Sequence, residues 1–203
     1  MKLIEYIGSQ FGNPQGIIGK ICCVIMNAIN QKMYTEVSDM VLKNSCIDIL
    51  DVGFGNGYLE KILSKHPGVM MKGIDISEDM IVSATKRNKK AVEQGRVVLS
   101  LGDCCNLDFP TEMFDAVTSV NTIYFWSDTV KGLTEINRVL KDKGIFVSAV
   151  YSQEWLKKLS YTKKGFKFFS KIDYISDGKK AGFSEVIIEE IVNGKSYIIK
   201  YIK

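Results

Sequence analysis

The stretch from Ile47 to Gly57 constrains the fold more than any other, because an apolar run ends in an acid and then in three glycines on alternate positions. This pattern predicts a buried strand that turns sharply into a helix. A glycine has no Cβ atom, so the backbone at such a turn can come close to a ligand. Gly53, Gly55 and Gly57 therefore predict a binding site for a nucleotide-like cofactor.

Two later apolar runs also end in an acid. Asp75 closes the run over residues 69–75, and Asp103 follows the run over residues 97–101. The carboxyl ends of neighbouring parallel strands meet at one edge of a sheet, so Asp51, Asp75 and Asp103 are predicted to lie around one crevice. Alternatively, each acid has only a local role, because aspartates also cap turns and bond to their own backbone. Their occurrence together at three strand ends favours the crevice.

The glycine spacing argues against a dinucleotide site. In the dinucleotide fingerprint the third glycine comes three residues after the second, whereas position 58 of this chain is Tyr. Asp51 would also repel a pyrophosphate, because it places negative charge two residues before the first glycine. A zwitterionic or cationic ligand fits this turn better.

Three short motifs, at residues 51–57, 73–77 and 102–104, closely resemble the cofactor motifs of class I S-adenosylmethionine-dependent methyltransferases. The resemblance covers residues 45–150, and the opening of the chain resembles the small bacterial methyltransferases of the ubiquinone/menaquinone-biosynthesis-like group. It implies S-adenosylmethionine as the cofactor, S-adenosylhomocysteine as the product, and no metal.

The resemblance also implies a role for each motif residue. The glycine loop would receive the methionine part of the cofactor, with Asp51 near its ammonium group. Asp75 would accept hydrogen bonds from both ribose hydroxyls, which suits an acceptor-only carboxylate. Asp103 and the backbone amide of Cys104 would bind the adenine, and Ile76 would pack on the adenine face.

Strand and helix signals alternate in the order that builds a doubly wound α/β fold. Strands are expected at residues 47–52, 69–75, 97–101, 114–120 and 145–151, with a hairpin at 185–192 and 196–202. Helices are expected at 56–65, 77–94, from 127 to near 141, and at 171–181, and the loop at 102–112 could hold a short helix. These segments predict a Rossmann-like, mostly parallel sheet of seven strands with helices on both faces and a C-terminal antiparallel hairpin.

One structural domain is expected, because 203 residues with 46% hydrophobic content can bury one substantial core. Residues 1–44 are predicted to form an N-terminal helical lid, with a helical region over 16–44 that breaks near 27–31. Residues 45–203 are predicted to form the cofactor-binding domain. Tyr34, late in the helical region, would reach the cofactor when the lid closes.

The aromatic residues after the fourth strand are the candidates for acceptor binding and catalysis. Tyr124 and Trp126 could hold a flat substrate, and Asn121 would supply backbone or amide contacts. Tyr124 could act as a base if its pKa were lowered. Alternatively, this cluster only packs the core. His66, the only histidine, falls at the opposite edge of the predicted sheet, so a histidine base is not expected.

Composition bears on location and partners. No apolar run reaches the roughly 18 residues that a membrane span needs, and five cysteines without a Cys-x-x-Cys spacing indicate a reducing cytoplasm and no metal site. Residues 151–180 hold eight lysines, which predict a solvated face or, alternatively, a patch for an anionic substrate or nucleic acid. The Asn/Asp-Pro-Pro-aromatic tetrad of base methylation is missing after the fourth strand, so a nucleic-acid partner is not expected.

The sequence thus predicts an enzyme that transfers a methyl group in line from S-adenosylmethionine to a small, partly apolar acceptor. A nicotinamide-dependent oxidoreductase is one alternative, but it would need a glycine at position 58 and a Tyr-x-x-x-Lys or histidine near the nicotinamide. The other is a non-catalytic protein that binds the cofactor as a sensor, or binds RNA through residues 151–180.

Overall fold

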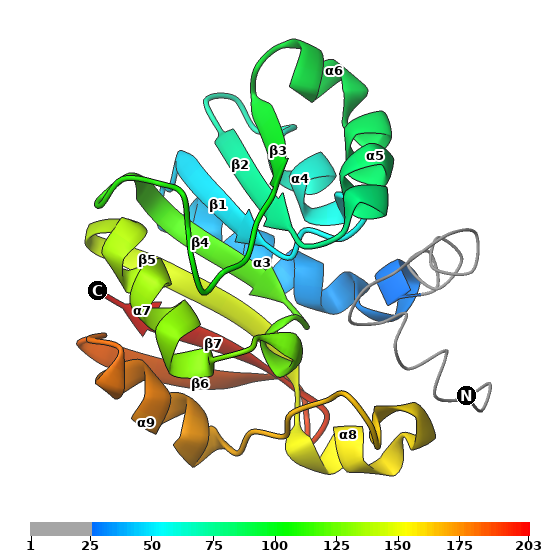
Figure 1. The fold of residues 1–203 in the computed structure, drawn as a ribbon, viewed down its shortest axis with the longest axis vertical. Coiled ribbons are helices and arrows are strands. Elements are labelled where there is room, and N and C mark those ends of the chain that lie inside the picture. Colours follow the sequence, from blue (N-terminus) through cyan, green and yellow to red (C-terminus); the bar gives the residue numbers. More distant parts are fainter. Residues whose placement is uncertain (1–25) are drawn as a thin grey trace.

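The computed structural model describes residues 26–203, which form a seven-stranded sheet with helices on both faces (Figure 1). The strands are β1 (Asp48–Val52), β2 (Met70–Asp75), β3 (Val97–Leu101), β4 (Phe114–Val120), β5 (Leu140–Tyr151), β6 (Glu185–Val192) and β7 (Ser196–Ile202). Their order across the sheet is β3-β2-β1-β4-β5-β7-β6. Strands β1 to β5 are parallel, and β7 lies antiparallel between β5 and β6. The predicted doubly wound sheet with its C-terminal hairpin is confirmed.

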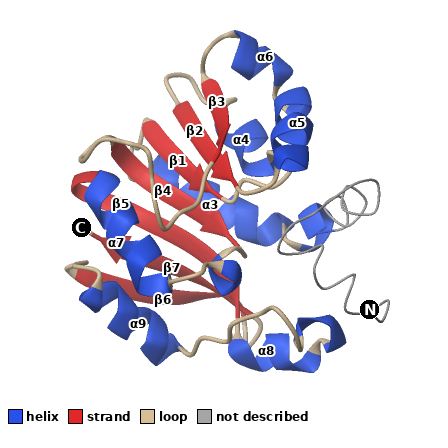
Figure 2. Ribbon diagram, in the orientation of Figure 1, coloured by secondary structure: helices blue, strands red, loops and turns tan. Residues whose placement is uncertain are grey.

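The helices connect the strands across both faces. They are α3 (Gln31–Lys43), α4 (Tyr58–Leu63), α5 (Glu78–Arg87), α6 (Lys89–Glu93), α7 (Thr129–Val139), α8 (Gln153–Lys158) and α9 (Lys171–Lys180), with short 3-10 helices η1 (Ile123–Phe125) and η2 (Ser160–Thr162). In Figure 2, α7 and α9 lie in front of the sheet and α3 lies behind it. None of the helices within residues 26–203 combines the length and the apolar character needed to cross a bilayer.

Each face of the sheet has its own apolar core. Beneath α7 and α9, the buried side chains include Leu133, Ile136 and Tyr174. On the opposite face, Val37 of α3 and Leu59 of α4 are buried against the strands. Although α3 falls within the predicted lid, it packs as part of the layer that covers the sheet.

The division of the chain at residue 44 stays a prediction. The expected break in the N-terminal helical region is present, since the backbone is helical at residues 26–29 and α3 begins at Gln31. The earlier part of the predicted lid, residues 1–25, lies outside the described residues.

Several predicted boundaries were wrong. The helix predicted at 77–94 is two helices that meet at Asn88, whose side-chain amide donates hydrogen bonds to the carbonyl oxygens of Gly57 (2.9 Å) and Ala84 (3.0 Å). The loop at 102–112 holds no helix, because Asp103 and Asn106 pair as an isolated β-bridge. Strand β5 begins directly after α7 rather than at residue 145, and α8 was not predicted.

Candidate active site

A cavity opens at the carboxyl ends of β1, β2 and β4, where the sequence predicted the crevice. It gathers most of the predicted site residues from these strand ends, from α3 and from the turn after β4. The lining residues are Met26, Asn27, Tyr34, Asp51, Val52, Gly53, Phe54, Gly55, Asn56, Ile74, Asp75, Ile76, Gly102, Cys104, Val120, Asn121, Thr122, Phe125 and Trp126. We call this the first cavity. Gly57, Asp103 and Tyr124 are predicted site residues that do not line it.

The three glycines of the turn have different surroundings. All three adopt positive φ angles, of 75° at Gly53, 55° at Gly55 and 74° at Gly57. A Cβ atom on Gly57 would lie 2.5 Å from Nδ2 of Asn88 and 2.8 Å from the Cβ of Ala84, so this glycine allows α4 and α5 to pack closely. A Cβ atom on Gly55 would meet nothing within 4 Å. Gly55 is therefore the position of the turn that leaves open space for a ligand.

Asp75 links the glycine turn to the next helix. Its carboxylate accepts hydrogen bonds from the backbone amides of Gly55 (2.9 Å) and Ser77 (3.0 Å). It is buried, and burial raises the pKa of this carboxyl above its ordinary value in spite of these bonds. The Asp75 side chain therefore has a local role, as acceptor from the Ser77 amide just before α5, and also lines the first cavity.

Asp51 lies beside a carboxyl group that sequence reasoning missed. Asp51 is 3% exposed, and its Oδ1 accepts a hydrogen bond from the Thr118 hydroxyl (2.6 Å). Glu60, on α4, has no exposed surface and lies within hydrogen-bonding reach of the Asp51 carboxyl. Burial raises the pKa of Asp51 to about 6 and that of Glu60 well above its usual range. The only sequence signal was an acid next to the apolar stripe of a short helix.

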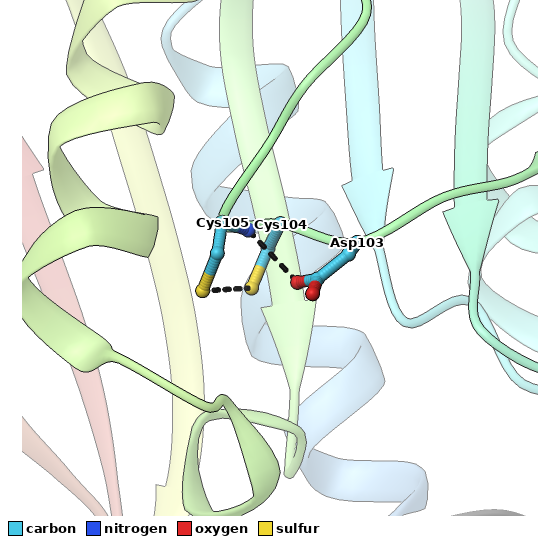
Figure 3. Close-up of side chains that lie close together, drawn as sticks. All are labelled: Asp103, Cys104 and Cys105. Atoms are coloured by element: carbon cyan, nitrogen blue, oxygen red, sulfur yellow. Dashed lines mark hydrogen bonds between the residues drawn. The ribbon is translucent and has the colours of Figure 1, made fainter.

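The segment after β3 places Cys104 in the cavity wall and Asp103 outside it (Figure 3). Asp103 is exposed, and its carboxylate accepts a hydrogen bond from the backbone amide of Cys105 (2.9 Å). This bond agrees with the alternative hypothesis that the acid bonds to nearby backbone. The two thiol sulfurs lie 3.9 Å apart, and the ligand atoms of all three residues lie within 4.8 Å of one another. Burial raises the pKa of Cys104, so without a bound metal its thiol is protonated near neutral pH.

The two predicted catalytic aromatics lie in different places. Trp126 lines the first cavity, and its Nε1 donates a hydrogen bond to the Thr122 hydroxyl (3.1 Å). Tyr124 is buried away from it, with its hydroxyl donating to Oδ1 of Asn121 (3.3 Å) and accepting from the Tyr151 backbone amide. Burial raises the pKa of Tyr124 well above its usual range. A lowered pKa was the condition for Tyr124 to act as a base, and the pKa of Tyr124 is shifted in the opposite direction.

Tyr124 belongs instead to a second, neighbouring cavity with mostly apolar walls. This second cavity is lined by Met26, Ile29, Asn30, Asn121, Tyr124, Phe125, Tyr151, Leu156, Tyr161 and Phe166. The second cavity shares Met26, Asn121 and Phe125 with the first cavity. Among the described residues, none that lines the second cavity carries a charge. Sequence reasoning missed Tyr151, Tyr161 and Phe166, which belong to no motif.

Polar residues before and within α3 close one side of the first cavity. The side-chain amide of Asn27 donates a hydrogen bond to Oδ1 of Asn56 in the glycine turn (3.1 Å). The Tyr34 hydroxyl donates to Oδ1 of Asn27 (3.5 Å), and the Tyr34 ring lies 5.0 Å from that of Tyr58. Tyr34 therefore reaches the first cavity from α3, whereas its predicted contact with the cofactor stays a prediction.

The remaining polar candidates, His66 and the lysines of residues 151–180, line neither cavity. His66 is exposed near the start of β2, at the edge opposite the first cavity. Several lysines of residues 151–180 have partners of their own: Lys167 donates hydrogen bonds to the carbonyl oxygens of Trp126 (2.6 Å) and Ser127 (2.8 Å). Lys180 pairs with Asp177 at 3.1 Å. Lys167 and Lys180 are therefore held by partners within the protein.

Comparison with known proteins agrees with the geometry. The family model described as a methyltransferase domain matches residues 50–148. An uncharacterized methyltransferase of Bacillus subtilis, YdaC, is 34% identical over 166 residues, which cover 81% of this chain and 87% of that protein. The chain belongs to the class I S-adenosylmethionine-dependent methyltransferases. The predicted family and reaction class are confirmed.

Other relatives of this methyltransferase are longer or more distant. The 2-methyl-6-phytyl-1,4-hydroquinone methyltransferase of spinach chloroplasts is 30% identical over 174 residues, which cover 81% of this chain but only 49% of that protein. The crystal structure of a SAM-dependent methyltransferase from Thermotoga maritima, a possible histamine N-methyltransferase, has a TM-score of 0.69 and 20% identity. The match covers 98% of this chain and 99% of that structure, so the two proteins share the fold.

Proposed function

We propose that this methyltransferase binds S-adenosylmethionine in the first cavity and a small, flat, largely apolar acceptor in the second. The observation that carries the proposal is that the two cavities meet at Met26, Asn121 and Phe125. One side of this junction has buried carboxyl groups and open backbone, and the other has uncharged aromatic walls. A cationic donor and an apolar acceptor would therefore come together there.

The walls of the first cavity suit the parts of S-adenosylmethionine. Asp51 faces the ammonium group, and Asp75 accepts hydrogen bonds from the ribose hydroxyls. The backbone at Gly55 leaves room that any Cβ atom would fill. Ile76, which is 55% exposed at the rim, offers an apolar surface for the adenine, with Cys104 beside it and Asp103 next in the chain.

Tyr34, Asn121 and Trp126 complete the donor side in this proposal. Tyr34 and Asn121 face the donor from α3 and from the turn after β4. Trp126 covers the donor rather than the acceptor, because it lines only the first cavity. Gly57 contributes through helix packing, and Tyr124 through the acceptor wall.

The second cavity offers binding surface but no base. S-adenosylmethionine supplies an activated methyl group on a sulfonium, and the protein aligns the acceptor and excludes water. Burial raises the pKa of Tyr124 and Tyr161, and that of Tyr151 to about 12, so these hydroxyls keep their protons near neutral pH. The acceptor atom must then be nucleophilic by itself. An electron-rich ring such as a hydroquinone, the substrate in the name of the spinach relative, meets both demands.

Binding of the donor is the first test. We expect S-adenosylmethionine and S-adenosylhomocysteine to raise the melting temperature of the protein and to give saturable heats in calorimetry, because a ligand that binds only the folded state stabilises it. NADH serves as the control, since the oxidoreductase alternative requires it. Stabilisation by NADH and not by S-adenosylmethionine would contradict the proposal.

The acceptor wall is tested by Phe166→Ala. The Phe166 ring lies 4.6 Å from that of Phe125 and 5.9 Å from that of Tyr124, so it forms part of the wall. With a short-chain 1,4-hydroquinone as probe, we expect KM for the probe to rise about tenfold, since a lost apolar contact of this size is worth about 1.5 kcal/mol. The Kd for S-adenosylmethionine should not change.

Phe169→Ala is the matched control for this test. Phe169 packs on Tyr174, with ring centroids 5.4 Å apart, and lines neither cavity. Equal effects of the two substitutions on KM would argue against the second cavity as the acceptor site.

A small-molecule acceptor and a cytoplasmic location remain parts of this proposal. The free thiols of Cys46, Cys104 and Cys105 are consistent with a cytoplasmic location.

A further inference from the structure

The carboxyl groups of Asp51 and Glu60 are both buried and lie side by side, and Asp51 lines the first cavity whereas Glu60 lies behind it. In the ladder between β1 and β2, Asp51 pairs with Gly73. A Cβ atom on Gly73 would lie 3.1 Å from Oε1 of Glu60, so the Glu60 carboxyl occupies the space above this glycine. Glu60 therefore reaches from α4 to the backbone position next to Asp51, and the missing side chain at Gly73 makes room for it.

Within the part of the chain that the structure describes, no cation balances this pair. Neither Asp51 nor Glu60 takes part in an ion pair within residues 26–203. The other titratable groups of the described residues that line the first cavity are Asp75 on β2, Tyr34 on α3 and Cys104 after β3, and none of them can carry a positive charge. Two ionised carboxylates in contact in such a site repel each other strongly.

A shared proton resolves this repulsion. Apart from its own backbone amide, no N–H or hydroxyl group of the described residues donates to either oxygen of Glu60. A carboxylic acid can donate its own proton to a neighbouring carboxylate, and the two groups then hold one proton between them. Asp51 is the better carboxylate of the two, because Thr118 already donates to it at 2.6 Å. The raised pKa of Glu60, caused first by burial and then by Asp51, agrees with this assignment.

We propose that Glu60 is a positioning residue that stays protonated and donates to Asp51, so that the pair presents a single negative charge to the ammonium group of the cofactor. Thr118 and Glu60 then fix the Asp51 carboxylate from two directions. The charge of the pair matches the single charge of the ammonium group. This inference rests on the proposed function only in naming the ligand of Asp51.

The charge of the pair depends on pH. Burial moves the pKa of Asp51 from 3.8 to about 6. As the pH falls through this value, the pair takes up a second proton and becomes neutral, so the affinity for S-adenosylmethionine should fall. Between pH 3.8 and about 6, the folded protein binds more protons than the unfolded chain. The free energy of unfolding of the ligand-free protein should therefore fall as the pH rises through this range.

Infrared spectroscopy of the ligand-free protein tests the shared proton directly. We expect the carbonyl band of a protonated carboxylic acid near neutral pH, shifted in deuterium oxide and lost in Glu60→Gln. The exposed Glu93 gives the control, because Glu93→Gln should leave the band in place. A wild-type spectrum without this band, or a band that persists in Glu60→Gln, would overturn the proposal. Neither outcome depends on cofactor binding.

Affinity separates positioning from packing. Glu60→Gln keeps an N–H donor for Asp51, so Kd for S-adenosylmethionine should stay within about threefold of wild type, whereas Glu60→Leu should weaken binding about tenfold because Asp51 loses its donor. Equal Kd values for Glu60→Leu and wild type would overturn the positioning role. If wild type binds no S-adenosylmethionine, the proposed function fails while the infrared result still decides the state of Glu60. If Glu60→Leu does not fold, the spectra and Glu60→Gln still decide it.

Discussion

Replacing Asp75 with asparagine is expected to weaken the binding of S-adenosylmethionine by at least about 100-fold. A carboxylate that accepts from two ribose hydroxyls makes two charge-assisted hydrogen bonds, each worth about 1.5–3 kcal/mol, and a loss of 2.8 kcal/mol is about 100-fold in Kd. Asparagine has only one acceptor oxygen. Its side-chain NH2 group would face another donor, either a ribose hydroxyl or the backbone N–H of Gly55, and could not accept a hydrogen bond from it. The loss should therefore come from both the ligand and the turn that Asp75 holds at 2.9 Å.

Calorimetry with Glu78→Gln as the control measures this effect. Glu78 is exposed in the first turn of α5, so the substitution removes the same charge three residues away without touching the cavity. An S-adenosylhomocysteine analogue without ribose hydroxyls separates the two causes. It should bind wild type weakly and lose only the part of the affinity that depends on the turn in Asp75→Asn. If the analogue binds wild type as tightly as S-adenosylhomocysteine and loses the full 100-fold in Asp75→Asn, Asp75 acts through the turn alone.

Gly57→Ala is expected to lower the free energy of unfolding by about 3 kcal/mol, since a left-handed backbone costs a non-glycine residue roughly 1–2 kcal/mol and overpacking costs a further 1–3 kcal/mol. The new methyl group would lie 3.0 Å from the Cα atom of Ala84, which is backbone and cannot move aside. Urea unfolding of the ligand-free protein measures the change.

Gly55→Ala is the natural comparison for this substitution. It has a similar φ angle, of 55°, but no atom within 4 Å of the added methyl group. We expect it to lose only about 1 kcal/mol of stability, the cost of the backbone alone, and yet to bind S-adenosylmethionine poorly because the methyl group fills the ligand space. Equal stability losses at positions 55 and 57, or unchanged affinity in Gly55→Ala, would contradict this division of roles.

The sheet and the donor side of the site could be predicted because their signals are local. Each parallel strand is a short apolar run, and Asp51 and Asp75 mark the strand ends that meet at one edge. The glycine spacing also distinguished a methyltransferase turn from a dinucleotide turn. Each strand signal lies within a single short run, and Asp51, the three glycines and Asp75 all lie within residues 51–75, so no knowledge of distant packing was required.

The rest depended on contacts between distant segments. Glu60 is buried because Gly73, on another strand, leaves room for its carboxyl group, and no pattern in either segment indicates this. The exposure of Asp103 likewise follows from a turn that bonds its carboxylate to the backbone of Cys105. The second cavity combines residues 26–30, the turn after β4 and residues 151–166, which carry no shared motif.

The separate origin of the two cavity walls has a consequence for how such enzymes diversify. The donor wall comes largely from one continuous stretch, residues 51–126, whereas the outer acceptor wall comes from residues 151–166 between β5 and α9. Under the proposed function, exchange of residues 151–166 would alter the molecule that is methylated and leave the methyl donor unchanged. New acceptor specificities could then arise by replacement of this one segment.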